Sequence, residues 1–181
     1  HCNSVIDVIK SSSNYEIDFF LDDNLKDKKF GKKKFLSGTK FLKENIKSKN
    51  IHISFASIYN LEKRLKLYTE IKKNNKYRFP NIVSSSSYIS TDCELSDGII
   101  VMHKALINSN VKINENVVIN TGSIIEHDVI IGKNSHISTG VIVNGGVKIG
   151  KNCFIGSGSV LRENAKISDN TFIKMGSVVK K

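Results

Sequence analysis

An aliphatic residue occupies every sixth position in the second half of the chain. Stepping by six from Ile89 to Val179 meets sixteen residues, and each of them is Ile, Leu or Val. The residue two positions before each of these is small or no larger than valine, with Ile99 as the exception. A strict period of six is typical of a parallel β-helix in which three hexapeptides make one triangular coil. The pattern therefore predicts a left-handed parallel β-helix over residues 88–181, with the aliphatic column pointing into its axis.

The corners of this prism are predicted from the residues that directly follow the aliphatic column. Asparagine or glycine occupies seven of these positions: Asn108, Asn114, Asn120, Gly132, Asn144, Gly150 and Gly156. Both residue types adopt left-handed backbone angles at low cost. The period runs without an insertion, so no long loop is expected to leave the prism.

The first part of the chain lacks this period and alternates between strand-like and helix-like segments. Helices are predicted over Val5–Ile9, Thr39–Ile46 and Asn60–Lys73, the last with Leu61, Leu65, Leu67 and Ile71 on its apolar stripe. Strands are predicted over Tyr15–Leu21, Ile51–Ala56 and Asn81–Val83. This alternation predicts a small parallel α/β, Rossmann-like domain over residues 1–83 that opens on its first helix, without a first strand. The boundary between the two domains is expected within Ser84–Ser87.

Charge and composition narrow the class of protein. The formal net charge is +11, and the excess lies in residues 1–80, with 18 Lys or Arg against 9 Asp or Glu. No basic stripe interleaved with aromatic residues follows, so we expect no nucleic-acid partner but a basic surface that favours anionic small ligands. No apolar stretch approaches the roughly 18 residues of a membrane span. The three cysteines (Cys2, Cys93 and Cys153) show no ligand-like spacing and indicate a reduced, cytoplasmic protein.

His127 is the candidate for chemistry because Glu126 and Asp128 flank it. A carboxylate that is hydrogen-bonded to one ring nitrogen raises the basicity of the other. Gly145 follows one coil of eighteen residues later, so it is predicted to stack on His127 with an open backbone N–H. A base beside such an amide suits acyl transfer, because the amide stabilises the developing oxyanion. The histidines of the prism do not converge at coil spacing, so no metal site is predicted.

Three segments carry a resemblance to a known family. They are VINTGSIIEHDVIIG at 118–132, SHISTG at 135–140 and GGVKIGKNCFIG at 145–156. The chain resembles, over nearly its whole length, the sugar acetyltransferases of the NeuD/PglD type within the hexapeptide-repeat transferases. The resemblance implies a homotrimeric enzyme that uses acetyl-CoA and no metal. Its substrate would be an amino group or hydroxyl of a sugar, typically a UDP-linked amino sugar, in surface polysaccharide or glycan biosynthesis.

The resemblance also implies roles for residues of the prism. The histidine that matches His127 is the general base in such enzymes, and the acid that matches Asp128 supports it. The position of His136 contacts acetyl-CoA, and the glycine that matches Gly145 offers its amide to the thioester.

Further roles follow from the same resemblance. The coils around Ser157 and Met175 are expected to line the coenzyme site. The sugar substrate is expected to bind residues 1–83, with His1 as the last residue of a Gly-rich loop and Asp22 and Asp23 as an acidic pair.

Two other functions remain open at this point. One is O-acetylation of sialic acid or a related free sugar. The other is a non-catalytic β-helix for binding or assembly, which the missing glycines of the loop favour.

Overall fold

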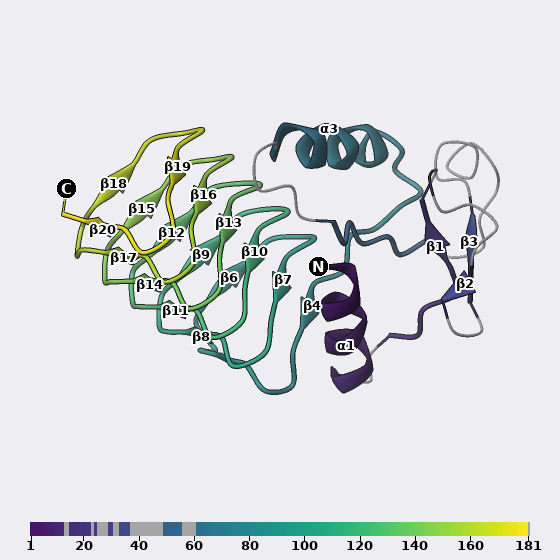
Figure 1. The fold of residues 1–181 in the computed structure, drawn as a ribbon, viewed down its shortest axis with the longest axis horizontal. Helices are drawn as coiled ribbons and strands as arrows, with labels where there is room; N and C mark the ends of the chain where they lie inside the picture. The colour runs from purple at the N-terminus through teal and green to yellow at the C-terminus, as the bar shows by residue number, and fades with distance from the viewer. Residues whose placement is uncertain are drawn as a thin grey trace.

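The computed structural model describes residues 1–12, 15–22, 24, 29–30, 33–36, 49–55 and 61–180. A β-helix lies beside a smaller part, whose described residues form two helices and three short strands (Figure 1). The C-terminus lies at the far end of the β-helix, whereas the N-terminus lies where the two parts meet (Figure 1). No described helix is long and apolar enough to span a membrane.

Three parallel sheets form the walls of the β-helix. The covered sheet contains β4 (Ile82–Val83), β7 (Ile100–Val101), β10 (Val118–Ile119), β13 (His136–Ile137), β16 (Phe154–Ile155) and β19 (Phe172–Ile173). The apolar sheet contains β5 (Tyr88–Ile89), β8 (Leu106–Ile107), β11 (Ile124–Ile125), β14 (Ile142–Val143), β17 (Val160–Leu161) and β20 (Val178–Val179). The charged sheet contains β6 (Glu94–Leu95), β9 (Lys112–Ile113), β12 (Ile130–Ile131), β15 (Lys148–Ile149) and β18 (Lys166–Ile167).

The core of the β-helix is made by the two inward columns that the period of six predicts. Ile107 and Ile125 from the aliphatic column, and Val111 and Val129 from the smaller column, are fully buried. Burial of an aliphatic side chain of this size contributes about 1.5–3 kcal/mol, so the repeated column stabilises every coil. The predicted β-helix is confirmed.

The β-helix begins one hexapeptide before the predicted start. β4 pairs with β7, so the strand predicted at Asn81–Val83 belongs to the prism and not to the first domain. Val83 stands six residues before Ile89 and extends the same aliphatic column, against which it packs.

The prediction for the left-handed corners was wrong by two residues. Positive φ occurs at every sixth residue from Gly98 to Gly176, and Asn110 and Asn116 are examples. The glycines predicted as corners serve close packing instead. A Cβ at Gly132 would come within 2.4 Å of the backbone of Gly150 in the next coil.

The smaller part contains α1 (Cys2–Ser12), α3 (Leu61–Lys72), β1 (Phe20–Leu21), β2 (Lys29–Phe30) and β3 (Lys33–Leu36). β1 pairs in parallel with β3, and β3 pairs antiparallel with β2. Both predicted helices at Val5–Ile9 and Asn60–Lys73 are confirmed over their described residues. The predicted strand Tyr15–Leu21 shortens to β1, and the described residues 51–55 form no strand beyond a bridge of Asn50 to Arg78. The predicted helix Thr39–Ile46 lies outside the described residues.

The two helices dock on the β-helix in different ways. Val5 and Val8 of α1 pack against the outer side chains of β4, β7 and β10. The first residue of α3 is held by a hydrogen bond of 3.0 Å from Asn134 Nδ2 to the Leu61 carbonyl oxygen. The predicted apolar stripe of α3 was partly wrong, because its buried face includes Arg64 and Tyr68, whereas Leu65 and Leu67 are only half-buried.

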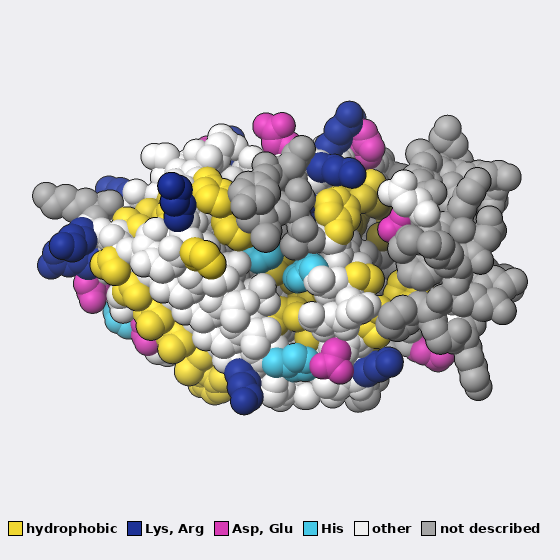
Figure 2. Space-filling model, in the orientation of Figure 1, with side chains coloured by type: hydrophobic (Ala, Val, Ile, Leu, Met, Phe, Trp, Pro, Cys, Tyr) yellow, Lys and Arg dark blue, Asp and Glu magenta, His cyan; other side chains and the backbone are white. Residues whose placement is uncertain are grey.

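The three outer faces of the prism differ in chemistry. The outward residues of the apolar sheet are Tyr88, Leu106, Ile124, Ile142, Val160 and Val178. None of these six is buried, and they form a diagonal row of hydrophobic side chains over β8, β11, β14, β17 and β20 (Figure 2). The charged sheet instead presents Glu94, Lys112, Ile130, Lys148 and Lys166. The third face is covered by α1 over β4, β7 and β10, whereas Phe172 of β19 is 47% exposed.

Candidate active site

His127 lies at the corner between β11 of the apolar sheet and β12 of the charged sheet. Its Nδ1 lies 2.7 Å from Oδ2 of Asp128, and the two side chains are 59% and 54% exposed. The predicted pairing with a carboxylate is therefore present. The carboxylate holds the proton on Nδ1, which leaves Nε2 as the basic nitrogen toward solvent.

Asp128 is fixed from two sides. Its backbone adopts φ of +62°, a left-handed conformation that aspartate tolerates better than most residues. Asn110, one coil earlier, donates from Nδ2 to Oδ1 of Asp128 at 2.6 Å. The second flanking acid has another task, because Glu126 accepts a hydrogen bond of 2.9 Å from Asn108. One carboxylate alone therefore orients the imidazole.

This pairing shifts both pKa values in opposite directions. The hydrogen bond to Asp128 is the largest influence on His127 and raises the pKa of its imidazole above the ordinary value of 6.5. The hydrogen bonds from His127 and Asn110 lower the pKa of Asp128 below its ordinary 3.8. His127 is thus a stronger base than a free histidine.

Gly145 packs directly against the imidazole of His127, as the spacing of eighteen predicts. A Cβ at this position would lie 2.7 Å from Cε1 and 2.8 Å from Nε2 of His127. Any larger residue would therefore displace the ring. No described residue accepts a hydrogen bond from the Gly145 N–H, whereas the neighbouring Gly146 N–H donates to the His127 carbonyl oxygen at 2.9 Å. The corner combines an exposed base with an uncommitted amide.

The other prism residues that the resemblance singles out lie elsewhere. His136 is the outward residue of β13 on the covered sheet, and it is 4% exposed. Within one chain the structure does not bring it to His127. Ser157 and Met175 lie one coil apart, at the corner between the covered and apolar sheets, and both are exposed. The Gly176 N–H donates to the Ser157 carbonyl oxygen at 2.9 Å, which fixes this stacking.

Two of the three predicted substrate residues lie in the described part of the first domain. His1 is exposed at the start of α1, with its ring centroid 6.1 Å from that of His136. Asp22 follows β1 and accepts a hydrogen bond of 2.8 Å from the Asn24 N–H. Asp23 lies outside the described residues.

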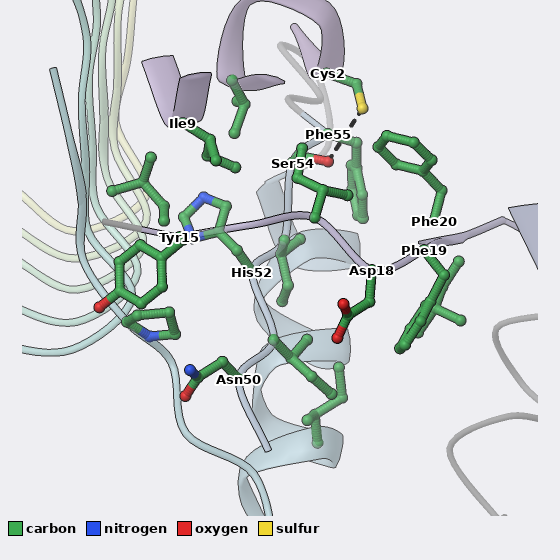
Figure 3. A pocket seen from close by; sticks show the side chains of 18 of the residues that line it. Cys2, Ile9, Tyr15, Asp18, Phe19, Phe20, Asn50, His52, Ser54 and Phe55 are labelled. Atoms are coloured by element: carbon green, nitrogen blue, oxygen red, sulfur yellow. Dashed lines mark hydrogen bonds between the residues drawn. The ribbon is translucent and has the colours of Figure 1, made fainter. Parts of the chain in front are cut away.

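A cavity of about 650 Å³ lies within the first domain, away from His127. Its wall includes Cys2, Tyr15, Asp18, Asp22, His52 and Ile82. Figure 3 shows how the side chains of Tyr15, Asp18, Asn50 and His52 surround it, and how Ser54 donates to the Cys2 sulfur. Asp22 therefore belongs to a cavity wall, whereas His1 belongs to the junction with the β-helix.

The sequence reasoning missed Arg64. This residue of α3 is 2% exposed, and its Nη1 donates to the carbonyl oxygens of Ile53 at 2.5 Å and Phe55 at 3.0 Å. The apolar stripe predicted for this helix did not include Arg64, which was grouped with the solvated basic residues. Its position four residues before the buried Tyr68 was the available signal.

No group of three or more His, Cys, Asp or Glu side chains that could hold a metal occurs among the residues that the structure describes.

Both parts of the chain contain a segment that matches a family model. Residues 1–71 match the family model described as the PglD N-terminal domain, and residues 146–181 match the bacterial transferase hexapeptide model (six repeats). The predicted family resemblance is confirmed. The match to this domain model agrees with the predicted Rossmann-like fold of the first domain.

Solved structures share the fold of this chain over nearly its whole length. WeeI from Acinetobacter baumannii matches at 24% identity with a TM-score of 0.88, over 99% of this chain and 86% of its own. PerB from Caulobacter crescentus, solved with CoA and GDP-perosamine, matches at 22% identity with a TM-score of 0.90, over 100% and 84%. The acetyltransferase domain of PglB from Neisseria gonorrhoeae matches at 21% identity with a TM-score of 0.89, over 98% and 85%. No curated protein matches the chain.

Proposed function

We propose that the chain is an acetyl-CoA-dependent acetyltransferase that acts on an amino group of a nucleotide-linked sugar, in the biosynthesis of a surface polysaccharide or glycan. The observation that carries the proposal is the His127–Asp128 pair packed over Gly145. The structural neighbours that were solved with CoA and a nucleotide-linked amino sugar support the same substrate pair.

The chemistry assigns one task to each group at the corner. Nε2 of His127 removes a proton from the acceptor nitrogen as that nitrogen attacks the thioester carbonyl carbon. The Gly145 N–H donates to the carbonyl oxygen as negative charge develops there. The C–S bond then breaks, coenzyme A leaves as its thiol or thiolate, and the acetyl group stays on the acceptor. Asp128 stabilises the imidazolium that forms, and no covalent enzyme intermediate is needed.

The coenzyme is proposed to bind in a cleft between copies of the chain. The apolar row of six side chains, none of which is buried, runs alongside the His127 corner, and a row of this kind is typical of a surface that packs against another protein. We assign this row to the interface of a homotrimer. His127 then borders the cleft, and Ser157 and Met175 at the other edge of the same sheet line the coenzyme site.

Activity assays on the purified protein test the reaction. Acetyl-CoA is mixed in turn with UDP-amino sugars and with free sugars, including sialic acid, and thiol release and product mass are measured. We expect acetylation of a UDP-amino sugar, and loss of that activity in His127→Ala. Activity on free sugars alone would replace the acceptor class. Failure of the protein to bind acetyl-CoA in calorimetry would contradict an enzymatic function.

The homotrimer is tested by its mass in solution. A lysine in place of Ile142 puts a charge in the middle of the apolar row, so Ile142→Lys should dissociate the trimer to monomers in sedimentation experiments. The control, Lys148→Glu on the charged sheet, should remain trimeric. A monomeric wild-type protein would contradict this part of the proposal.

A further inference from the structure

Arg64 is a buried cation, and no described acidic residue forms an ion pair with it. Its guanidinium belongs to a residue that is 2% exposed, and its Nε and Nη2 have no hydrogen-bond partner among the described residues. Only Nη1 is used, by the carbonyl oxygens of Ile53 and Phe55. A buried charge that lacks both a paired anion and part of its hydrogen bonds is costly, by several kcal/mol.

The unused edge of Arg64 has a shape that selects its partner. Nε–H and one Nη2–H of a guanidinium point in parallel and form a fork that matches two oxygens of a phosphate or carboxylate. Nη1, which lies outside this fork, is the group that is already bound to the protein backbone. The fold therefore anchors Arg64 through one nitrogen and leaves the bidentate edge open.

A second polar atom without a hydrogen-bond partner among the described residues lies at the same junction. His136 is 4% exposed on the covered sheet, and its Nε2 has no hydrogen-bond partner among the described residues. The hydrogen bond from Asn134 to the Leu61 carbonyl oxygen holds the start of α3, and with it Arg64 in the first turn, against the strand that carries His136. The N-terminal end of a helix adds a further partial positive charge.

The electrostatic effects of Arg64 agree with this arrangement. Burial lowers the pKa of Arg64 to about 10, with no carboxylate among the influences on it. Burial, and then the charge of Arg64, lower the pKa of His136 to about 4 and that of His52 to about 3. The junction is thus a region of positive potential that no described acidic side chain offsets.

We propose that Arg64 and His136 form a binding site for a phosphate or diphosphate group, at the junction between the first domain and the β-helix. The ring of His1 lies 6.1 Å from that of His136 at this junction. Histidine side chains are visible at this junction in Figure 2. A nucleotide sugar and coenzyme A both carry such a group, and the choice of this pair rests on the proposed function.

Calorimetry on the full chain tests the site without requiring turnover. The probes are inorganic pyrophosphate, UDP and coenzyme A, titrated into wild-type protein, Arg64→Gln, His136→Asn and the control Arg78→Gln, which replaces an exposed arginine of the same domain. Loss of a charge-assisted hydrogen bond pair should weaken pyrophosphate binding about tenfold or more in Arg64→Gln. Arg78→Gln should bind as the wild type does.

The two nucleotide probes identify the source of the phosphate. Weaker binding of UDP alone in Arg64→Gln assigns the site to the acceptor, and weaker binding of coenzyme A alone assigns it to the acetyl donor. Equal affinities of wild type and Arg64→Gln for all three probes, or no binding of any probe to the wild type, would overturn the site. A site that binds pyrophosphate while acetyl transfer is absent would leave this inference intact and remove the proposed function.

A measurement on wild-type protein covers the case in which Arg64→Gln does not fold. An anion bound between Arg64 and His136 favours the charged imidazole, so the pKa of His136 should rise from its low value when pyrophosphate binds. The ring signals of His136 in NMR titrations report this pKa directly. A His136 pKa that is unchanged by saturating pyrophosphate would assign Arg64 a purely structural role.

Discussion

His127 and His136 are nine residues apart and belong to the same β-helix, yet their surroundings shift their pKa values in opposite directions. His127 is exposed and hydrogen-bonded to Asp128, so its pKa is raised. His136 has no carboxylate partner among the described residues, and its burial, followed by the charge of Arg64, lowers its pKa to about 4. The surroundings of His127 make its imidazole a stronger base, whereas those of His136 keep its imidazole uncharged. The role of each histidine therefore depends more on the part of the outer surface where it lies than on the hexapeptide repeat to which it belongs.

Replacing His127 and His136 in turn should give the largest difference between two variants in kcat. General base catalysis contributes about a hundredfold or more, so His127→Ala should lower kcat by at least about that factor. His136→Asn leaves the base in place, so its effect should fall mainly on the binding of substrate or coenzyme. Steady-state kinetics at saturating substrate separate the two effects. Near-normal turnover of His127→Ala would remove it from the chemistry.

Gly145→Ala should have the next largest effect. The added methyl group needs the space that His127 Cε1 and Nε2 occupy, so the ring must move away from its productive position. We expect a loss in kcat of about tenfold to a hundredfold with His127 still present. Gly122→Ala is a useful control, because a Cβ there meets nothing within 4 Å. The control should lose stability through its positive φ, by roughly 1–2 kcal/mol, and keep its turnover.

Asp128→Asn should change the pH dependence more than the maximal rate. The base works only when its Nε2 is unprotonated, so activity rises with pH through the pKa of His127. Because the hydrogen bond to Asp128 raises that pKa, its loss should move the acid limb of the pH–rate profile to lower pH. Asparagine also tolerates the left-handed backbone of this position. Glu126→Gln should move the limb much less, and an equal shift in both variants would contradict the assignment of Asp128 as partner.

The sequence predicted the β-helix and the His127 corner because both depend on local periodicity. A period of six fixes which residues point inward, and a coil of eighteen places Gly145 against His127 without any knowledge of the rest of the fold. The left-handed corners were misplaced because Asn and Gly recur for two reasons, positive φ at Asn110 and close packing at Gly132. Composition alone does not separate these reasons.

The role of Arg64 could not be predicted in this way. A basic residue on a lysine-rich helix is normally solvated, whereas Arg64 is buried and donates to the carbonyl oxygens of Ile53 and Phe55, outside its own helix. The position of His136 under the first domain is a tertiary property as well. Periodicity reveals that His136 points outward but contains no information on what covers that face.

The spacing of eighteen residues between His127 and Gly145 also restricts how this protein can change in length. One inserted residue between them would turn the following inward residues outward and separate the base from its glycine. Removal or addition of an entire coil at the C-terminal end would preserve every neighbour of the corner, because each coil contacts only the adjacent ones. Length variation among functional versions of this prism should therefore occur in whole coils, and a shortened variant that lacks the last coil should keep the geometry of its catalytic corner.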